Sequence, residues 1–258
     1  MNLSVTPNEH VTFRIRHEDS AVVVVEKPAR LVTQPGKGHE DDTLLNGLFA
    51  RWGALLQNLG SSRDFGLLHR LDRDTSGLIV IALTASAYDA MREKFEGREV
   101  KKFYWAVTAR TPREAQGVIR KPIAEFEGNR EGARMKLARV SSSGKTAVTA
   151  YRVLAESAVG ALLECHPVTG RLHQVRVHLE AIGCPIVGDP LYGGKAQTGS
   201  RLGLHAHRLT FEHPVTGATL DVTTGWPSDL RNLLRRLELP RPDLRLAGED
   251  GARASDTA

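Results

Sequence analysis

The sequence has few of the features that mark secreted or membrane proteins. Its two cysteines, Cys165 and Cys184, are too few for a disulfide framework. No uninterrupted apolar run approaches the roughly 20 residues that cross a bilayer, and residues 1–10 lack the apolar stretch of a secretory signal. We therefore expect a reduced, cytoplasmic protein with no membrane segment.

The common motifs for metal and nucleotide binding are also missing. No HExxH or CxxC spacing occurs, and Gly193-Gly194-Lys195 lacks the spacing of a Walker loop. His205-Ala206-His207 would place two imidazoles on one strand face, which keeps a zinc site open as an alternative. We expect neither a metal nor a cofactor.

The charge balance favours a polyanionic partner. The chain has 35 Lys and Arg against 30 Asp and Glu, a net charge of +5, while 41% apolar residues suit a folded globular protein. The basic residues recur beside the predicted loops: Arg51, Arg63, Arg70, Arg73, Lys101, Lys102, Arg171, Arg176, Lys195 and Arg201. This distribution indicates a basic surface around a site.

Strands outnumber helices in the predicted order of elements. Alternating or β-branched runs predict strands at 11–16, 21–26, 78–83, 101–108, 147–154, 161–166 and 204–211. Apolar periodicity and capping residues predict helices after Thr43, after Ser86, between Thr169 and Gly183, and at 228–237. Segment 110–146 is polar and glycine-rich, and we expect strands and turns there.

Because strands and helices do not alternate, we expect an α+β fold with a mixed, mostly antiparallel central sheet flanked by helices and loops. No internal repeat or long linker divides the chain. We predict a single domain at 1–242 and a disordered tail at 243–258, which has little apolar content.

The segment 69–77, His-Arg-Leu-Asp-Arg-Asp-Thr-Ser-Gly, predicts a charged loop fixed to the buried strand at 78–83. Asp72 lies between Arg70 and Arg73, which would keep its carboxylate ionised at neutral pH. A solvated loop aspartate is the alternative. We assign chemistry to Asp72, and to Asp74 a capping role toward the amides of residues 76 and 77.

Two further segments carry candidate site residues. His173 and Arg176 are three residues apart in a predicted helix and would share one face, where Arg176 could pair with an aspartate. The alternative is a surface arginine. Tyr104 follows two lysines in a predicted strand; it is either a packed core residue or a ring that stacks on a planar base.

Taken together, six ordered motifs resemble the RluA-type pseudouridine synthases over roughly residues 20 to 220. The motifs are Val24-Val25-Glu26-Lys27-Pro28; His69-Arg70-Leu71-Asp72 with Thr75-Ser76-Gly77-Leu78; Lys102-Phe103-Tyr104; Gly170-Arg171 with His173-Gln174-Val175-Arg176-Val177-His178-Leu179; Pro185-Ile186-Val187-Gly188-Asp189 with Tyr192-Gly193; and Leu204-His205-Ala206 with Leu209 and Phe211-Glu212-His213-Pro214.

The resemblance implies roles for four residues. Asp72 falls on the family's catalytic aspartate, Tyr104 on the tyrosine that stacks against the target base, and Arg176 on the arginine that pairs with the aspartate. Arg70 falls on the arginine that helps to hold the target nucleotide out of its stack. It also implies the pseudouridine synthase catalytic fold.

Substrate-binding roles are assigned to further residues of the same motifs: His69, Thr75, Arg171 and His173. The chain departs from the family pattern at Glu26, where Asp is frequent, and at Leu172, where Thr is common. Some relatives carry a small N-terminal RNA-binding domain ahead of the first strand. Only about twenty residues precede that strand here, and we expect that module to be missing.

The implied activity is the isomerisation of specific uridines in structured RNA, ribosomal or transfer RNA, to pseudouridine. We expect the protein to act as a monomer. The reaction has no net redox change and needs no cofactor, and the target base must leave its stack. Asp72 would act either as a nucleophile or as a base at the sugar. Two alternatives stay open: an RNA-binding protein without the chemistry, and a hydrolase that releases the base.

Overall fold

The computed structural model describes residues 3–130, 133–193 and 201–241. A nine-stranded sheet runs through the molecule in the order β1-β2-β3-β10-β4-β9-β8-β5, with β11 paired to β10. The strand bounds are β1 Arg14–Glu18, β2 Val22–Lys27, β3 Ser76–Ala82, β4 Lys101–Thr108, β5 Gln116–Arg120, β8 Val148–Ser157, β9 Gly160–Pro167, β10 Leu204–Glu212 and β11 Thr219–Thr223. Among the described pairs only β3 and β10 are parallel, so the predicted mixed, mostly antiparallel sheet is confirmed.

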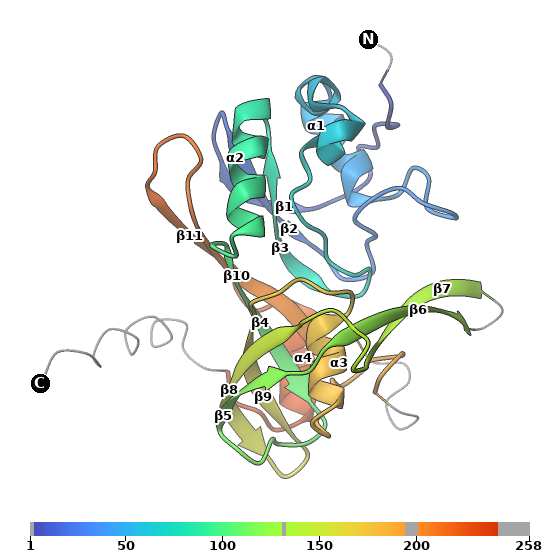
Figure 1. Ribbon diagram of the computed structural model, residues 1–258, viewed down its shortest axis with the longest axis vertical. Coiled ribbons are helices and arrows are strands. Elements are labelled where there is room, and N and C mark those ends of the chain that lie inside the picture. The colour runs from blue at the N-terminus through green and yellow to red at the C-terminus, as the bar shows by residue number, and fades with distance from the viewer. Residues whose placement is uncertain (1–2, 131–132, 194–200, 242–258) are drawn as a thin grey trace, which may run out of the picture.

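Helices cover both faces of the sheet (Figure 1). Alternate residues of β2 and β3 pack against α1 (Leu44–Leu59) on one face and against α2 (Ala85–Glu96) on the other. Alternate residues of β4 and β9 pack in the same way against α3 (Gln174–Glu180) and α4 (Ser228–Arg236). Because both faces are covered, β3 is buried along its whole length, as its uninterrupted apolar sequence predicts.

The two parts of the sheet meet where β3 and β10 pair. Gly77 lies opposite Ala206 with φ +125°, and a Cβ at position 77 would lie 2.2 Å from the Ala206 carbonyl oxygen. Only glycine fits this close approach. The predicted active-site loop, 69–75, therefore enters the sheet at the seam between its two parts.

A two-stranded hairpin extends from the body of the protein (Figure 1). It is formed by β6 (Ile123–Arg130) and β7 (Ala133–Val140), which pair with each other and not with the main sheet. These strands and β5 bear out the prediction of strands and turns in segment 110–146.

Several predicted boundaries shift in the structure. The first strand begins at Arg14 and not at residue 11. Helix α2 is capped by Thr84, whose hydroxyl accepts a hydrogen bond from the Ala87 amide at 3.2 Å, so the predicted Ser86 cap is wrong. The predicted tail at 243–258 lies outside the described residues. No helix among the described residues is long and apolar enough to cross a membrane.

Candidate active site

The predicted site residues surround one cleft of about 680 Å³. Its walls come from the loop before β3, from β4, from the end of α2, from the turn before α3 and from the β6–β7 hairpin. The predicted site residues that line it are His69, Arg70, Asp72, Thr75, Tyr104, Arg171, His173 and Arg176. The structure therefore brings together residues that are up to about a hundred positions apart in the sequence.

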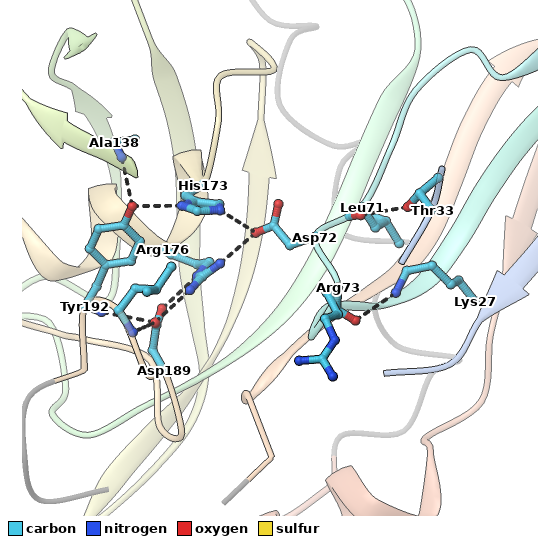
Figure 2. A network of polar contacts seen from close by, with 11 residues as sticks. Lys27, Thr33, Leu71, Asp72, Arg73, Ala138, His173, Arg176, Asp189 and Tyr192 are labelled. Atoms are coloured by element: carbon cyan, nitrogen blue, oxygen red, sulfur yellow. Dashed lines mark hydrogen bonds and ion pairs between the residues drawn. The ribbon is translucent and has the colours of Figure 1, made fainter. Parts of the chain in front are cut away.

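Asp72 is bound to Arg176 at the wall of this cleft (Figure 2). Arg176 Nη1 donates to Asp72 Oδ2 at 2.9 Å, and Arg176 Nε and Nη2 donate to the two oxygens of Asp189, each at 2.8 Å. The Arg176 side chain is 4% exposed and that of Asp189 is fully buried, whereas Asp72 is 23% exposed. The alternative of a surface arginine is thus wrong.

The charges in this network support one another. Burial lowers the pKa of Arg176, but its hydrogen bonds and charge contacts with Asp189 and Asp72 outweigh that effect and raise the pKa above the ordinary value. Burial likewise raises the pKa of Asp189, and Arg176 more than compensates, so the Asp189 pKa is lowered. Both groups stay charged at neutral pH, and Arg176 offers Asp72 a fixed cation.

One oxygen of Asp72 is left for a substrate. Arg176 engages Oδ2, and within the described part of the chain no side chain or amide donates to Oδ1. Because Asp72 is also the most exposed member of the network, the structure holds its carboxylate by one edge and presents the other edge to the cleft.

His173 and Tyr192 complete the wall beside Asp72. His173 Nε2 lies 3.8 Å from Asp72 Oδ2, and its Nδ1 is 2.8 Å from the Tyr192 hydroxyl, which accepts from the Ala138 amide of the hairpin. His173 has φ +52° and precedes α3, so the prediction that it shares a helix face with Arg176 is wrong. The two residues still meet at Asp72. Burial lowers the pKa of His173.

The backbone on both sides of Asp72 is anchored by buried side chains (Figure 2). Lys27 Nζ donates to the carbonyl of Arg73 at 3.1 Å, and the Thr33 hydroxyl donates to the carbonyl of Leu71 at 2.8 Å. Lys27 is fully buried and also donates to two carbonyls of its own loop. Burial lowers its pKa to about 7. These contacts fix the peptide units that carry Asp72.

Tyr104 lines the cleft and packs against two core clusters, the one beneath α1 and the one beneath α3. Burial, with a contribution from Asp72, raises the pKa of its hydroxyl. It is thus both a packed residue and a cleft residue. Arg70 is exposed at the rim, and Arg171 Nε donates to the carbonyl of Thr146 at 3.1 Å.

Thr75 closes the turn after Asp72, because its amide donates to the Asp72 carbonyl at 3.1 Å. Its own hydroxyl is buried and has no hydrogen-bond partner in the described part of the chain. The capping bonds predicted from Asp74 to the amides of Ser76 and Gly77 are not formed among the described residues, so that expectation is wrong.

His69 ties the start of the loop to β3 and α2. Its Nε2 accepts a hydrogen bond from the Val80 amide at 3.1 Å, and its ring packs against Phe95. Burial, together with the nearby charge of Lys102, lowers its pKa to about 3. The ring is therefore neutral at physiological pH, with Nε2 as the acceptor.

This half-buried neutral histidine predicts acid sensitivity. Between pH 6.5 and pH 3 an unfolded His69 binds a proton that the folded His69 does not, so the stability falls as the pH falls. From pH 7 to pH 5 we expect His69 to remove about 2 kcal/mol of unfolding free energy. Urea unfolding at the two pH values measures the loss. In His69→Gln the loss should shrink by that amount; an equal loss in both proteins would contradict the prediction.

Sequence reasoning gave no role to Asp189, Tyr192, Lys27 or Thr33. Asp189 and Tyr192 stand in the quoted motif around Gly188, and Lys27 stands in the first motif, so their places in the motifs were the available signal. Nothing in the sequence around Thr33 indicated a role for it.

The alternative of a zinc site involved His205 and His207. Both ring nitrogens of His205 lie 2.7 Å from hydroxyl groups, those of Ser76 and Thr224. The described residues contain no group of three or more metal-ligating side chains.

Residues 21–181 match the family described as RNA pseudouridylate synthase. The chain belongs to that family. An RNA pseudouridine synthase of Synechocystis is 34% identical over 229 residues, 88% of this chain and 69% of that protein. The ribosomal large subunit pseudouridine synthase D of Zymomonas mobilis is 36% identical over 239 residues, 89% of this chain and 74% of that protein.

The fold agrees with this assignment. Human RNA pseudouridylate synthase domain containing 4 superposes with a TM-score of 0.69 at 30% identity, covering 89% of this chain and 95% of that one. The resemblance to RluA-type synthases is thereby confirmed, as is the pseudouridine synthase fold. As a member of this family, the protein is an isomerase that acts on RNA.

Proposed function

We propose that this pseudouridine synthase isomerises specific uridines of ribosomal RNA, with Asp72 as the catalytic carboxylate and with the target base flipped into the cleft. One observation carries the proposal: Asp72 is held by Arg176 through one oxygen and presents the other to the cleft, next to Tyr104. An ionised carboxylate in that position can attack the target nucleotide.

The chemistry requires a group of this kind. In the reaction the bond from uracil N1 to C1′ of the ribose breaks, the freed uracil turns, and a bond from C5 to C1′ forms, while the proton on C5 is lost and N1 gains one. Asp72 acts either as the nucleophile or as the base at the sugar. Tyr104, His173 and Arg176, which line the cleft together with Asp72, keep the uracil in place between the two bond changes.

The other site residues take supporting roles in the proposal. Tyr104 stacks on the uracil ring, and Arg176 orients the carboxylate. Arg70, which is exposed at the rim, helps to hold the flipped nucleotide. His69, Thr75, Arg171 and His173 line the cleft and contact the nucleotide or its neighbours in the proposal.

RNA-backbone contacts offset the unstacking of the target, which costs a few kcal/mol. The cleft provides cations for these contacts. Arg70, Arg98 and Lys136 line it, and none of the three forms an ion pair with a described residue. We therefore expect the affinity for RNA to fall steeply as salt rises.

Ribosomal RNA is preferred over transfer RNA as the substrate because similar proteins are named as large-subunit ribosomal pseudouridine synthases. Such a substrate fits action in the cytoplasm. That the protein works as a monomer stays a prediction, which light scattering on the purified protein tests.

Mapping of pseudouridines tests the proposed function. Carbodiimide labelling of total RNA from cells with and without the gene should reveal one or a few positions that lose the modification, and they should lie in large-subunit ribosomal RNA. A lost position in transfer RNA would replace the substrate. With purified protein, the RNA mass should stay unchanged; release of free uracil would indicate a hydrolase, and no change at all would contradict the activity.

A further inference from the structure

Lys102 occupies a place in the cleft that the proposed chemistry leaves unused. It precedes Tyr104 by two residues on β4, so both side chains point to the same side of the strand. Its ammonium group lies 5.7 Å from the centre of the Phe95 ring and 3.8 Å from where a Cβ on Gly170 would stand. Groups from α2, β4 and the turn before α3 thus converge on one point of the cleft wall.

This ammonium group has no acidic partner in the described part of the chain. By contrast, Lys94 of α2 forms ion pairs with two carboxylates, those of Glu212 and Glu99. Lys102 is half-buried against an aromatic ring, and burial alone lowers its pKa. A half-buried cation without a counter-charge is unfavourable, and an anion bound from outside would relieve the cost.

Among the described residues, Lys102 forms no hydrogen bond or ion pair with Asp72, Arg176 or Asp189. The charge of Asp72 acts on Tyr104 and on Lys27, whereas burial is the cause that lowers the pKa of Lys102. The charge of Lys102 instead acts on His69. An anion bound at Lys102 therefore need not displace the Asp72 carboxylate from Arg176.

We propose that Lys102, with the open space beside Gly170, forms a subsite for a phosphodiester of the RNA backbone next to the flipped uridine. The inference rests on the proposed function, since it needs an RNA strand in the cleft. Two residues along a strand span about 6.6 Å, so a uracil stacked on Tyr104 and a phosphate on Lys102 belong to the same nucleotide or to its immediate neighbour. Gly170 leaves room for that phosphate, because a Cβ there would meet only the Lys102 ammonium.

The first test is the salt dependence of RNA binding, measured with transcribed large-subunit ribosomal RNA. In Lys102→Met the slope of log affinity against log salt should fall by about one, and affinity at moderate salt should drop roughly tenfold. Lys102→Arg should keep the wild-type slope. Lys101→Met is the matched control: it removes the same charge from the adjacent, exposed residue on the other side of the strand, and its slope should equal that of wild type.

The second test locates the phosphate. Short RNAs that span the mapped uridine are made with one neutral methylphosphonate at a time. Wild type should lose affinity at one linkage beside the target, and Lys102→Met should show no further loss at that linkage, as expected for two changes that remove a single contact. Additive losses at every linkage would overturn the proposal.

The outcomes separate this inference from the proposed function. If the slope of Lys102→Met is unchanged while its turnover at saturating RNA falls, the residue acts on the uracil and the subsite is wrong. If wild type forms no pseudouridine but the slopes differ as expected, the function fails and the subsite stands. If Lys102→Met at saturating RNA reaches the wild-type turnover with a raised KM, both stand.

Discussion

An Asp72→Asn variant should form no measurable pseudouridine, a loss of at least about a thousandfold in turnover, on the scale seen when an essential catalytic group is removed. The amide has the shape of the carboxylate but is neither a nucleophile nor a base, so it fails in both mechanisms that we consider. RNA affinity should stay within about threefold, because the phosphate contacts come from cations elsewhere in the cleft. Release of labelled C5 protons from uridine measures the turnover, and filter binding measures the affinity.

The matched control is Asp74→Asn. Asp74 stands two residues away in the same loop and its side chain is also half-buried, so the variant removes an equal charge from the same segment. We expect it to keep most of the wild-type turnover. Wild-type activity in Asp72→Asn would remove the carboxylate from the mechanism, and equal losses in both variants would show that the loop and not the carboxylate is being disturbed.

The predicted loop and strand at 69–83 were accessible from the sequence because their signals are local. A charged, glycine-ended segment that runs into a β-branched apolar block gives a loop and a buried strand without any knowledge of the rest of the chain. The two-sided burial of β2 and β3 follows from the same kind of pattern. The order of the strands does not, because β10 is inserted between β3 and β4 from a distant part of the sequence.

The wrong predictions at the starts of α3 and α2 concern local backbone conformation, which the spacing of apolar residues does not reveal. Apolar spacing extended the predicted helix to Thr169, but His173 adopts a left-handed conformation that no helical pattern reveals, and α3 begins only at Gln174. His173 still reaches Asp72 because the turn points it there. The position of Thr84 at the start of α2 is a similar case, since two hydroxyl residues competed for the cap.

The contacts that hold Asp72 and Arg176 in place join residues far apart in the sequence, so they become visible only in the folded structure. Arg176 needs Asp189, which stands in a segment with no periodic pattern, and the Asp72 loop needs Lys27 and Thr33, which stand about 40 residues earlier in the sequence. A buried arginine between two carboxylates cannot be told from a surface arginine by spacing alone. The family motifs indicated these residues but not what they touch.

Replacing Arg176 should therefore cost stability as well as turnover. Arg176→Met leaves the carboxylate of Asp189 fully buried, with the Leu191 and Tyr192 amides as its remaining donors among the described residues, and it leaves Asp72 without its anchor. Breaking a buried ion pair in this way destabilises a protein by about 3–5 kcal/mol. Urea unfolding should show a loss of that size, and pseudouridine formation should fall at least about a hundredfold.

A second substitution separates the two effects. Asp189→Asn in the Arg176→Met background removes the buried charge and keeps an oxygen that accepts from the Leu191 and Tyr192 amides, so most of the lost stability should return. Turnover should not return, because nothing then orients Asp72. If the double variant regains both stability and turnover, Arg176 acts only through the fold; if it regains neither, the buried charge of Asp189 is not the cause of the instability. Arg176→Lys, which cannot bridge two carboxylates with a planar fork, should fall between wild type and Arg176→Met in both measurements.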